Sequence, residues 1–498
     1  MDKRYVMALD EGTTGARAII FDENGHIVSD AAQEFTQIYP QPGWVEHNPL
    51  EILNTQLDMA RKAIAKANIS PEEIRAIGIT NQRETTVIWE KATGKPVYNA
   101  IVWGSSQSTP FSEKWAAEGL EQEIRDKTGL FCSPSFSATK IAWILANVPG
   151  AREKAEKGEL LFGNIDSWLI WNLTGGKSHV TDYSNASRTM IFNIHTLTWD
   201  EELCSKFGIP MSLLPKPLPC NANFGTVEKE KLGAEIPVHG VAGDQQSALF
   251  GQACFTPGMA KMTYGTAGIF MINTGNQPVY SDGLLTTVAW GLDGQVSYAV
   301  EGYVLYSGAT IQWLRDGAHF IFNAADSEWY GNMVEDTEGV YLVPGFSGLG
   351  APYWDAYARG IIVGITRGTS RDHIIRAGLD ALSYQTRDIV ECLGGAMEIP
   401  ELRIDGGAIK NNLLCQFQAD ILGIPVVRPT VIEMTAQGAA FLAGLGSGLW
   451  KDFDDITKRW EIDKTFKPSM TEERRNNLYK GWRSAVELSL GWAKKVTL

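Results

Sequence analysis

The sequence feature that most constrains the fold is a turn of small polar residues between two apolar strands, which occurs once in each half of the chain. Residues 5–21 predict strand, turn and strand around Glu11-Gly12-Thr13-Thr14-Gly15. Residues 258–273 predict the same order around Tyr264-Gly265-Thr266-Ala267-Gly268. Helical and extended segments alternate after each turn. This internal repeat predicts two similar α/β domains that face one another.

The length of the chain supports two domains. It has 498 residues, whereas a single hydrophobic core stops growing at roughly 250–300 residues. The segment Gly-Gln-Ala-Cys-Phe-Thr-Pro at 251–257 interrupts the periodic pattern, as expected at a domain boundary. We therefore expect domains at 1–252 and 253–498. Since no long linker separates them, they should pack together and hinge.

Charge and cysteine usage restrict the partners and the compartment. Lys and Arg number 44 against 58 Asp and Glu, a net charge of −14, which makes nucleic acid and anionic membranes unfavourable partners. The six cysteines show no CxxC pair or metal-ligand spacing. The start of the chain has no signal-peptide pattern, and no stretch reaches the ~18 apolar residues of a membrane helix. A soluble cytoplasmic protein without membrane insertion is expected.

The first turn has the composition of a phosphate-binding site. Its small residues allow backbone N–H groups to approach an anion closely, and the hydroxyls of Thr13 and Thr14 add donors. Asp10 stands at the end of the preceding strand, where a carboxylate could hold Mg²⁺ through water. An ordinary β-hairpin is the alternative interpretation of this segment.

Two further segments place polar residues at strand ends. Asp244 follows Gly243 ahead of an apolar helix, so it could accept a proton from a substrate hydroxyl or simply cap the helix. Arg83 and Glu84 end an apolar strand within Asn-Gln-Arg-Glu-Thr. They could hold hydroxyl groups as donor and acceptor, or form a surface ion pair.

A third segment, Asp-Gly-Gly-Ala at 405–408 with Asn411 one turn later, lies between a strand and a helix. Its glycines leave room for a flat nucleoside or a phosphate group. The alternative is a plain turn between a helix and a strand.

The order of these motifs resembles that of the FGGY carbohydrate kinases over essentially the whole chain. The motifs are LDEGTT, NQRETT, AIVW, SFSATKIAW, DYSNASRTM, AGDQQSALFGQ, TYGT, GLGAPYWD, GIIVGITRGTSRDH and DGGA. Within the family, PGWVEH, NQRETT and GLGAPYWD follow the members that phosphorylate glycerol. The resemblance implies two ribonuclease-H-like domains of the actin/Hsp70/sugar-kinase type, with ATP and substrate in the cleft between them.

The resemblance also implies roles for individual residues. It assigns Asp10 to Mg²⁺ and Asp244 to the general base. The positions implied for ATP are Thr13, Thr14, Gly15, Arg17, Thr266, Gly308, Gln312, Gly407 and Asn411. The positions implied for the polyol are Arg83, Glu84, Trp103, Ser135, Asp244, Gln245 and Phe270. A small polyol needs such charged hydrogen-bonding groups on one side and aromatic walls on the other.

The sequence departs from the family pattern at several of these places. Residues 104–109 read Gly-Ser-Ser-Gln-Ser-Thr where the family has a Gln and an arginine pair. Ser135 replaces a tyrosine that closes over the polyol, and Gly15 replaces a serine of the first phosphate turn. Serine at 135 is expected to leave a void beside the substrate.

These observations support one leading hypothesis and two alternatives. The leading one is ATP-dependent phosphorylation of glycerol to sn-glycerol 3-phosphate. A kinase for a longer or altered polyol or ketose, such as a tetritol, is the first alternative, because Ser135 and the missing arginines would suit it. A weakly active regulator that binds nucleotide and polyol is the second. A homo-oligomer, dimer or tetramer, is expected as the usual symmetric outcome.

Overall fold

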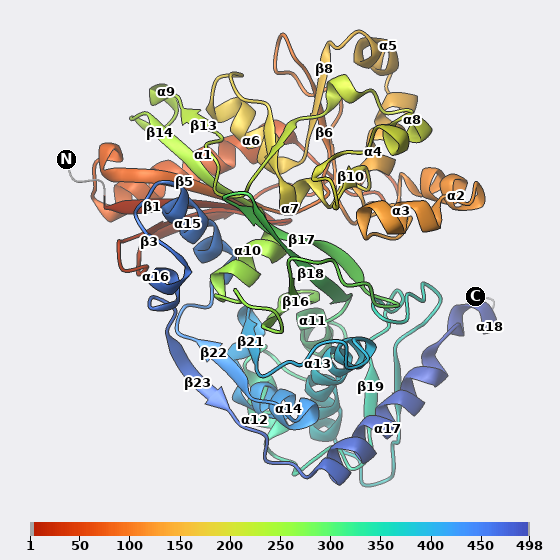
Figure 1. The fold of residues 1–498 in the computed structure, drawn as a ribbon. Coiled ribbons are helices and arrows are strands. Elements are labelled where there is room, and N and C mark those ends of the chain that lie inside the picture. The colour runs from red at the N-terminus through yellow and green to blue at the C-terminus, as the bar shows by residue number, and fades with distance from the viewer. Residues whose placement is uncertain (1–3, 497–498) are drawn as a thin grey trace.

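The first half of the chain is organised around a six-stranded sheet. The computed structural model describes residues 4–496, and Figure 1 shows this sheet in red to yellow-green. The strand order is β13-β14-β5-β1-β2-β3. β1, β2 and β3 are antiparallel, and β5 and β14 run parallel to β1. The strands are β1 (Tyr5–Glu11), β2 (Gly15–Phe21), β3 (Ile27–Glu34), β5 (Ile74–Asn81), β13 (Gly225–Val227) and β14 (Ile236–Gly243).

The second half repeats this topology. Its seven-stranded sheet has the order β17-β18-β16-β15-β21-β22-β23, with β15, β16 and β18 antiparallel and β21 and β22 parallel to β15. The strands are β15 (Ala260–Tyr264), β16 (Gly268–Gly275), β17 (Leu285–Leu292), β18 (Gln295–Val304), β21 (Leu402–Asp405), β22 (Val426–Pro429) and β23 (Ile462–Phe466). The predicted internal repeat and fold class are confirmed.

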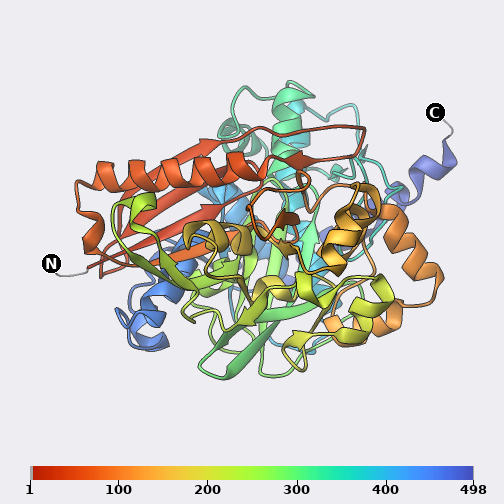
Figure 2. The same ribbon diagram turned by 90° about the horizontal axis from the view of Figure 1, so that it is seen from above.

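Local sequence signals explain where the long helices begin and end. α1 (Pro49–Ala67) starts after Asn48, whose side chain accepts from the Leu50 N–H, and proline occupies its first turn. It ends at Asn68, which adopts a left-handed conformation. Figure 2 shows α1 lying along one face of the first sheet. α13 (Arg371–Cys392) is capped by Ser370 and crosses the second half.

A helical insertion between β5 and β14 forms a second core in the first half. Buried residues of this insertion, including Trp115, Phe136 and Ile141, make up that core. Its elements are β6 (Val87–Glu90), β7 (Ala100–Ile101), α2 (Thr109–Ala117), α3 (Glu121–Thr128), α4 (Ser137–Asn147), α5 (Ala151–Glu156), β8 (Leu160–Gly163), α6 (Ile165–Leu173), β9 (Val180–Asp182), α7 (Tyr183–Ala186), β10 (Phe192–Asn193), β11 (Thr198–Trp199), α8 (Glu201–Phe207), β12 (Lys216–Leu218) and α9 (Lys229–Leu232).

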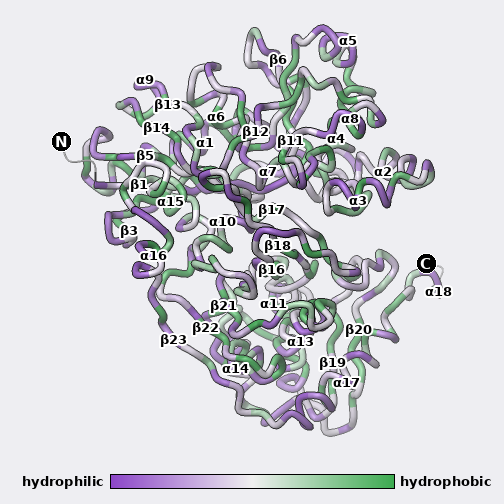
Figure 3. Tube along the Cα trace, viewed as in Figure 1, coloured by the Kyte–Doolittle hydropathy of each residue, from purple (hydrophilic) through white to green (hydrophobic). Residues whose placement is uncertain are grey.

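The remaining elements are short strands and helices around the two sheets. They are β4 (Glu46–His47), α10 (Asp244–Gly251), α11 (Gly308–Asp316), α12 (Asp326–Gly331), β19 (Tyr341–Val343), β20 (Ile361–Val363), α14 (Asn412–Leu422), α15 (Met434–Gly446), α16 (Phe453–Thr457), α17 (Glu472–Ser489) and α18 (Trp492–Lys495). Figure 3 shows hydrophobic and hydrophilic residues mixed along many of these elements, as expected where one face packs on a core and the other meets solvent.

One helix from the second half packs on the sheet of the first. α15 lies against β1, β5 and β14, and Figure 1 shows it beside the red strands. The approach is close, because a Cβ on Gly78 of β5 would lie 2.1 Å from the Ala439 carbonyl oxygen. Glycine is therefore required at position 78. The two sheets divide near the expected boundary, but α15 crosses it, so domains at 1–252 and 253–498 stay a prediction.

Two findings concern the expected compartment. All six cysteines are free thiols. Among residues 4–496, no helix is both long enough and apolar enough to cross a membrane.

Candidate active site

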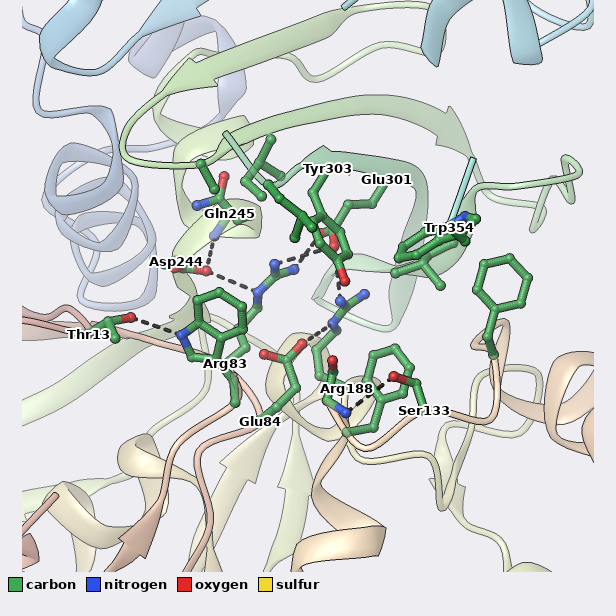
Figure 4. A pocket seen from close by; sticks show the side chains of 18 of the residues that line it. Thr13, Arg83, Glu84, Ser133, Arg188, Asp244, Gln245, Glu301, Tyr303 and Trp354 are labelled. Atoms are coloured by element: carbon green, nitrogen blue, oxygen red, sulfur yellow. Dashed lines mark hydrogen bonds and ion pairs between the residues drawn. The ribbon is translucent and has the colours of Figure 1, made fainter. Parts of the chain in front are cut away.

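A cavity of about 950 Å³ lies between the two turns that the sequence repeats. Thr13 and Thr14 of the first turn and Thr266 of the second line it. Arg83, Glu84 and Trp103 contribute from the first half, and residues of β18 contribute from the second. Figure 4 shows these side chains converging from both halves. The fold thus brings together the strand-end motifs that the sequence places far apart.

A chain of four buried charged side chains forms the floor of this cavity. Glu301 of β18 accepts from Arg83 (Nη1–Oε2, 2.5 Å) and from Arg188 (Nη2–Oε1, 2.9 Å). Arg188, just after α7, also donates from Nε to Oε1 of Glu84 over 2.7 Å. Glu301 comes from the second half of the chain, whereas the other three come from the first (Figure 4). The charges therefore link the two halves.

The arginines keep Glu301 ionised. Burial acts to raise the pKa of its carboxyl, but Arg188 and Arg83 outweigh this effect and lower the pKa to about 2. Burial lowers the pKa of Arg83, but Glu301, Glu84 and Asp244 together raise it above the ordinary arginine value. Nη1 of Arg188 is buried and has no hydrogen-bond partner among residues 4–496. The hydrogen bonds among these four groups hold them in fixed positions.

Asp244 is held beside this chain by Arg83. Its Oδ1 lies 3.0 Å from Nε of Arg83 and accepts from the Gln245 N–H over 2.7 Å. Asp244 is the first residue of α10, and the N-cap position belongs to Gly243. The interpretation of Asp244 as the helix N-cap is therefore wrong. The carboxylate instead lines the cavity.

The side chain of Gln245 is fixed by a buried lysine. Nζ of Lys261 donates to Oε1 of Gln245 over 2.5 Å and to Oγ1 of Thr263 over 2.8 Å. Burial lowers the pKa of Lys261 to about 8, although Asp405, Glu301 and Asp244 act in the opposite direction. Because Lys261 takes the amide oxygen of Gln245, the amide NH₂ of Gln245 remains to donate.

Asp10 supplies a carboxyl group of the kind that Mg²⁺ binds, although it is outside the cavity lining. Burial raises the pKa of its carboxyl from 3.8 to about 7; Arg17 lowers it, whereas Glu433 and Asp244 raise it further. A bound cation would favour the charged form of such a carboxyl. No group of three or more His, Cys, Asp or Glu side chains in the described part of the chain is placed to hold a metal. Mg²⁺ commonly takes one or two carboxylates and completes its shell with phosphate oxygens and water, so Asp10 fits that requirement.

The second turn is docked on the start of α11. The N–H groups of Ser307 and Ala309 donate to the Thr266 carbonyl over 3.0 and 3.1 Å, and the Gly308 N–H donates to the Gly265 carbonyl over 2.8 Å. A Cβ on Gly308 would lie 2.7 Å from that same oxygen. These contacts fix the side of the cavity formed by the second half.

Comparison with known proteins assigns the chain to a family. The N-terminal domain of the FGGY family of carbohydrate kinases matches residues 5–251, and the C-terminal domain matches residues 260–447. The chain belongs to the FGGY family of carbohydrate kinases. Curated relatives include a protein named glycerol kinase in Caldanaerobacter subterraneus subsp. tengcongensis, 58% identical over 495 residues, which span 99% of this chain and 100% of that protein. Glycerol kinase 2 of Thermotoga maritima is 57% identical with the same coverage.

Solved structures agree with this assignment. The crystal structure of Plasmodium falciparum glycerol kinase with ADP superposes with a TM-score of 0.92 at 37% identity, covering 100% of this chain and 99% of that one. A ligand-bound xylulose kinase from Lactobacillus acidophilus superposes with a TM-score of 0.87 at 23% identity, covering 97% of each chain, which shows a shared fold.

The cavity of this FGGY kinase includes many of the residues expected from the sequence, but not all. Those that line it are Thr13, Thr14, Arg83, Glu84, Trp103, Ser135, Asp244, Gln245 and Thr266. Gly308, Gln312, Gly407 and Asn411 are outside its lining. Gln312 is exposed on α11 and Gly407 is exposed beyond β21, whereas Asn411 caps α14 through the Leu414 N–H. Arg17 forms an ion pair with Glu433.

Two further residues that the sequence places at the site, Phe270 and Gly15, are not part of the cavity lining. Phe270 is fully buried in the core of the second half, and its neighbour Ile269 lines the cavity instead. The prediction for Phe270 is corrected to Ile269, because adjacent side chains on β16 point to opposite faces of the sheet. Gly15 begins β2, and a Cβ there would lie 2.6 Å from the Gln33 carbonyl oxygen. Glycine at position 15 therefore allows β3 to pack closely against the start of β2.

The residues after Trp103 that differ from the family pattern lie outside the cavity. None of residues 104–109 lines it. Ser106 donates to the Gly43 carbonyl over 2.9 Å, and Ser105 donates to Oε1 of Gln107 over 3.0 Å. These residues tie their loop to the segment around Gly43. The missing arginine pair therefore does not enlarge the substrate site.

Sequence reasoning did not single out several of the lining residues. Arg188, Glu301, Tyr303 and Trp354 are among them. Arg188 and Trp354 occur within the motifs DYSNASRTM and GLGAPYWD, which were available as signals. Glu301 is a charged residue in an otherwise apolar stretch of β18, and this pattern could have marked it as functional.

Proposed function

We propose that this kinase transfers the γ-phosphate of ATP to glycerol, giving sn-glycerol 3-phosphate and ADP. The observation that carries the proposal is the 3.0 Å contact between Asp244 and Arg83 in a cavity bounded by both repeated turns. This arrangement puts a carboxylate and hydroxyl-binding charges beside backbone suited to phosphate. Full-length relatives at 57–58% identity named glycerol kinase support the same substrate.

The residues divide the reaction between them. Asp244 accepts the proton of the attacking substrate hydroxyl. The oxygen of that hydroxyl bonds to the γ-phosphorus as the bond between the γ-phosphorus and the ADP oxygen breaks. Arg83 donates to substrate hydroxyls and Glu84 accepts from them. Glu301 holds Arg83 in position for this, and Arg188 holds Glu84. Fixed charges of this kind need little reorganisation when the substrate binds.

The phosphate groups belong at the repeated turns. Thr13, Thr14 and Thr266 offer hydroxyl and backbone donors there, and Trp103 holds Thr13 through Nε1–Oγ1 at 2.9 Å. Mg²⁺ would be held near Asp10 and would neutralise phosphate charge. The nucleotide would extend toward Gly308, Gln312, Gly407 and Asn411, outside the cavity lining.

A longer polyol is not favoured over glycerol. The space expected beside Ser135 is bordered by Tyr303, which reaches across from β18. A purely regulatory role has no need for a carboxylate held by an arginine at the site of proton transfer. The proposal includes a cytoplasmic location and a homo-oligomeric state.

Product analysis tests this proposal. Purified protein with ATP, Mg²⁺ and glycerol should yield ADP and glycerol 3-phosphate in equal amounts by phosphorus NMR, and a dehydrogenase specific for the sn-3 enantiomer should consume the product fully. ADP accompanied only by inorganic phosphate, or no ADP, would overturn it. A matched reaction without glycerol measures background hydrolysis.

A further inference from the structure

Tyr303 reaches into the cavity from the second half of the chain. On β18 it stands opposite Ile269 of β16, and both side chains line the cavity. Glu301 lies two residues earlier and therefore on the same face of the strand. The ring of Tyr303 also packs against the core of the helical insertion, which contains Phe136. Tyr303 thus spans the space between the two halves.

The phenol of Tyr303 keeps a proton that it can donate. Burial raises its pKa to about 12, with Glu301 and Glu84 adding to the effect. Arg188 and the Ser135 side chain act in the opposite direction and lower the pKa. The phenol is therefore neutral, and its own O–H remains available to a ligand oxygen.

Tyr303 and Asp244 lie toward opposite ends of the charge chain. Arg83 contacts Asp244 with Nε and Glu301 with Nη1, so it separates the proton acceptor from β18. Tyr303 lies beyond Glu301, beside Trp354, whose ring centroid is 5.0 Å away at 80°. Figure 4 shows Asp244, then Arg83, then Tyr303, then Trp354 across the cavity. A substrate with one end at Asp244 would direct its other end toward the phenol.

We propose that Tyr303 determines the length of the substrate by donating a hydrogen bond to the hydroxyl farthest from the one that is phosphorylated and by closing the site behind a three-carbon polyol. This inference rests on the proposed polyol kinase function. Trp354 packs edge-on against the ring of Tyr303. No other side chain reaches this position from β18, because Glu301 is committed to two arginines.

The hydrogen bond is tested with Tyr303→Phe and two substrates. Glycerol has the distal hydroxyl, whereas propane-1,2-diol phosphorylated at C1 has a methyl group there. A neutral hydrogen bond is worth about two- to tenfold in affinity. Tyr303→Phe should therefore lower kcat/KM for glycerol by about that factor, mainly through KM, and leave the diol unchanged. Equal losses for both substrates would overturn the inference.

Tyr298→Phe provides a matched control. Tyr298 is buried on the same strand and donates to the Ile194 carbonyl over 2.7 Å, but it is not part of the cavity lining. Its replacement removes a comparable hydrogen bond without touching the site. The ratio of kcat/KM for glycerol to that for the diol should stay at the wild-type value. A changed ratio would overturn the assignment to Tyr303.

Closure of the site is tested with Tyr303→Ala and four-carbon polyols. Removing the ring should raise kcat/KM for erythritol relative to glycerol by at least about tenfold, since the steric barrier is gone. A wild-type enzyme that already prefers erythritol would overturn the inference. So would an unchanged ratio in the alanine variant.

A binding measurement separates this inference from the proposed function. If the wild-type protein phosphorylates no polyol, the proposed function fails. Calorimetric titration of glycerol into the wild type and into Tyr303→Phe then decides the role of the phenol alone. Weaker glycerol binding by the variant supports the inference, whereas equal binding, or no binding to the wild type, overturns it.

Discussion

At the scale of single residues, the position of Asp244 determines the expected effect of its loss. Asp244→Asn keeps the size of the side chain and removes the proton acceptor, so kcat should fall by about 10²–10⁴. Nucleotide binding, measured by calorimetry, should remain. Asp58→Asn, which alters an exposed ion pair with Arg61, should retain full activity. An Asp244→Asn enzyme with more than about a tenth of the wild-type kcat would refute the assignment.

From the raised pKa of Asp10 we predict that its carboxylate lowers the stability of the ligand-free protein at neutral pH, although catalysis needs it. Because its pKa is about 7 when folded and near 3.8 when unfolded, the folded protein binds more protons between these values, and stability falls as pH rises from about 4 to about 7. Asp10→Asn should therefore stabilise the ligand-free protein by up to about 4 kcal/mol at pH 8 and much less at pH 4. Thermal unfolding at both pH values checks this.

The same substitution should impair catalysis. Without the Asp10 carboxylate, the Mg²⁺ concentration for half-maximal rate should rise by at least about tenfold. An Asp10→Asn variant with wild-type magnesium dependence, or with equal stabilisation at pH 4 and pH 8, would contradict the role of Asp10.

Single residues also show where prediction from the sequence succeeded and where it could not. The family resemblance assigned both Arg83 and Asp244 to the polyol site. Their contact follows from β5 and β14, which are parallel and end at one edge of the sheet. Phe270 was placed one residue out of register, and one residue reverses the face of a strand. The ion pair of Arg83 with Glu301 joins residues from opposite halves of the chain, which no local pattern reports.

At the scale of elements, β18 supplies the residue that anchors both arginines. Replacing Glu301 with glutamine leaves two buried guanidinium groups short of a negative charge, and breaking such a pair costs about 3–5 kcal/mol. We expect Glu301→Gln to lower the thermal midpoint and to raise KM for glycerol far more than KM for ATP, because Arg83 loses its orientation. Steady-state kinetics with each substrate varied in turn measures the split.

Glu301→Asp controls for the charge itself. Aspartate keeps the negative charge on a shorter side chain, so it should restore part of the lost affinity for glycerol. Equal rises in both KM values for Glu301→Gln, or no recovery with aspartate, would indicate a general folding defect.

Elements with strong local signals were the most predictable. Residues 49–67 have a proline start, an asparagine at each end and an apolar face, and α1 has those bounds. The packing of α15 on the first sheet was not predictable in the same way. It depends on Gly78 and on the alanines of α15 meeting at close range, a tertiary contact with no signature in either segment alone.

At the scale of the whole molecule, charged pairs join the two halves of the chain. Arg17 near the first turn pairs with Glu433 at the start of α15, and Glu301 pairs with Arg83. Phosphate arriving at the first turn would compete with Glu433 for Arg17. The internal repeat was visible in the sequence because both turns keep their composition, but these links between the halves were not.

Closure of the halves is therefore expected when both substrates bind. Small-angle scattering with a non-hydrolysable ATP analogue and glycerol should give a smaller radius of gyration than the ligand-free protein, since the site must exclude water from the γ-phosphate. Glycerol alone serves as the comparison. An unchanged radius under saturating ligands would contradict closure.

Competition between substrates tests the central claim most directly. Glycerol, erythritol and xylulose are mixed in equal amounts with the wild-type enzyme, Mg²⁺ and limiting ATP, and the phosphorylated products are counted by mass spectrometry. Because the site joins Asp244 to Tyr303 around a three-carbon polyol, glycerol phosphate should account for nearly all of the product. A mixture dominated by the phosphate of erythritol or xylulose would contradict it.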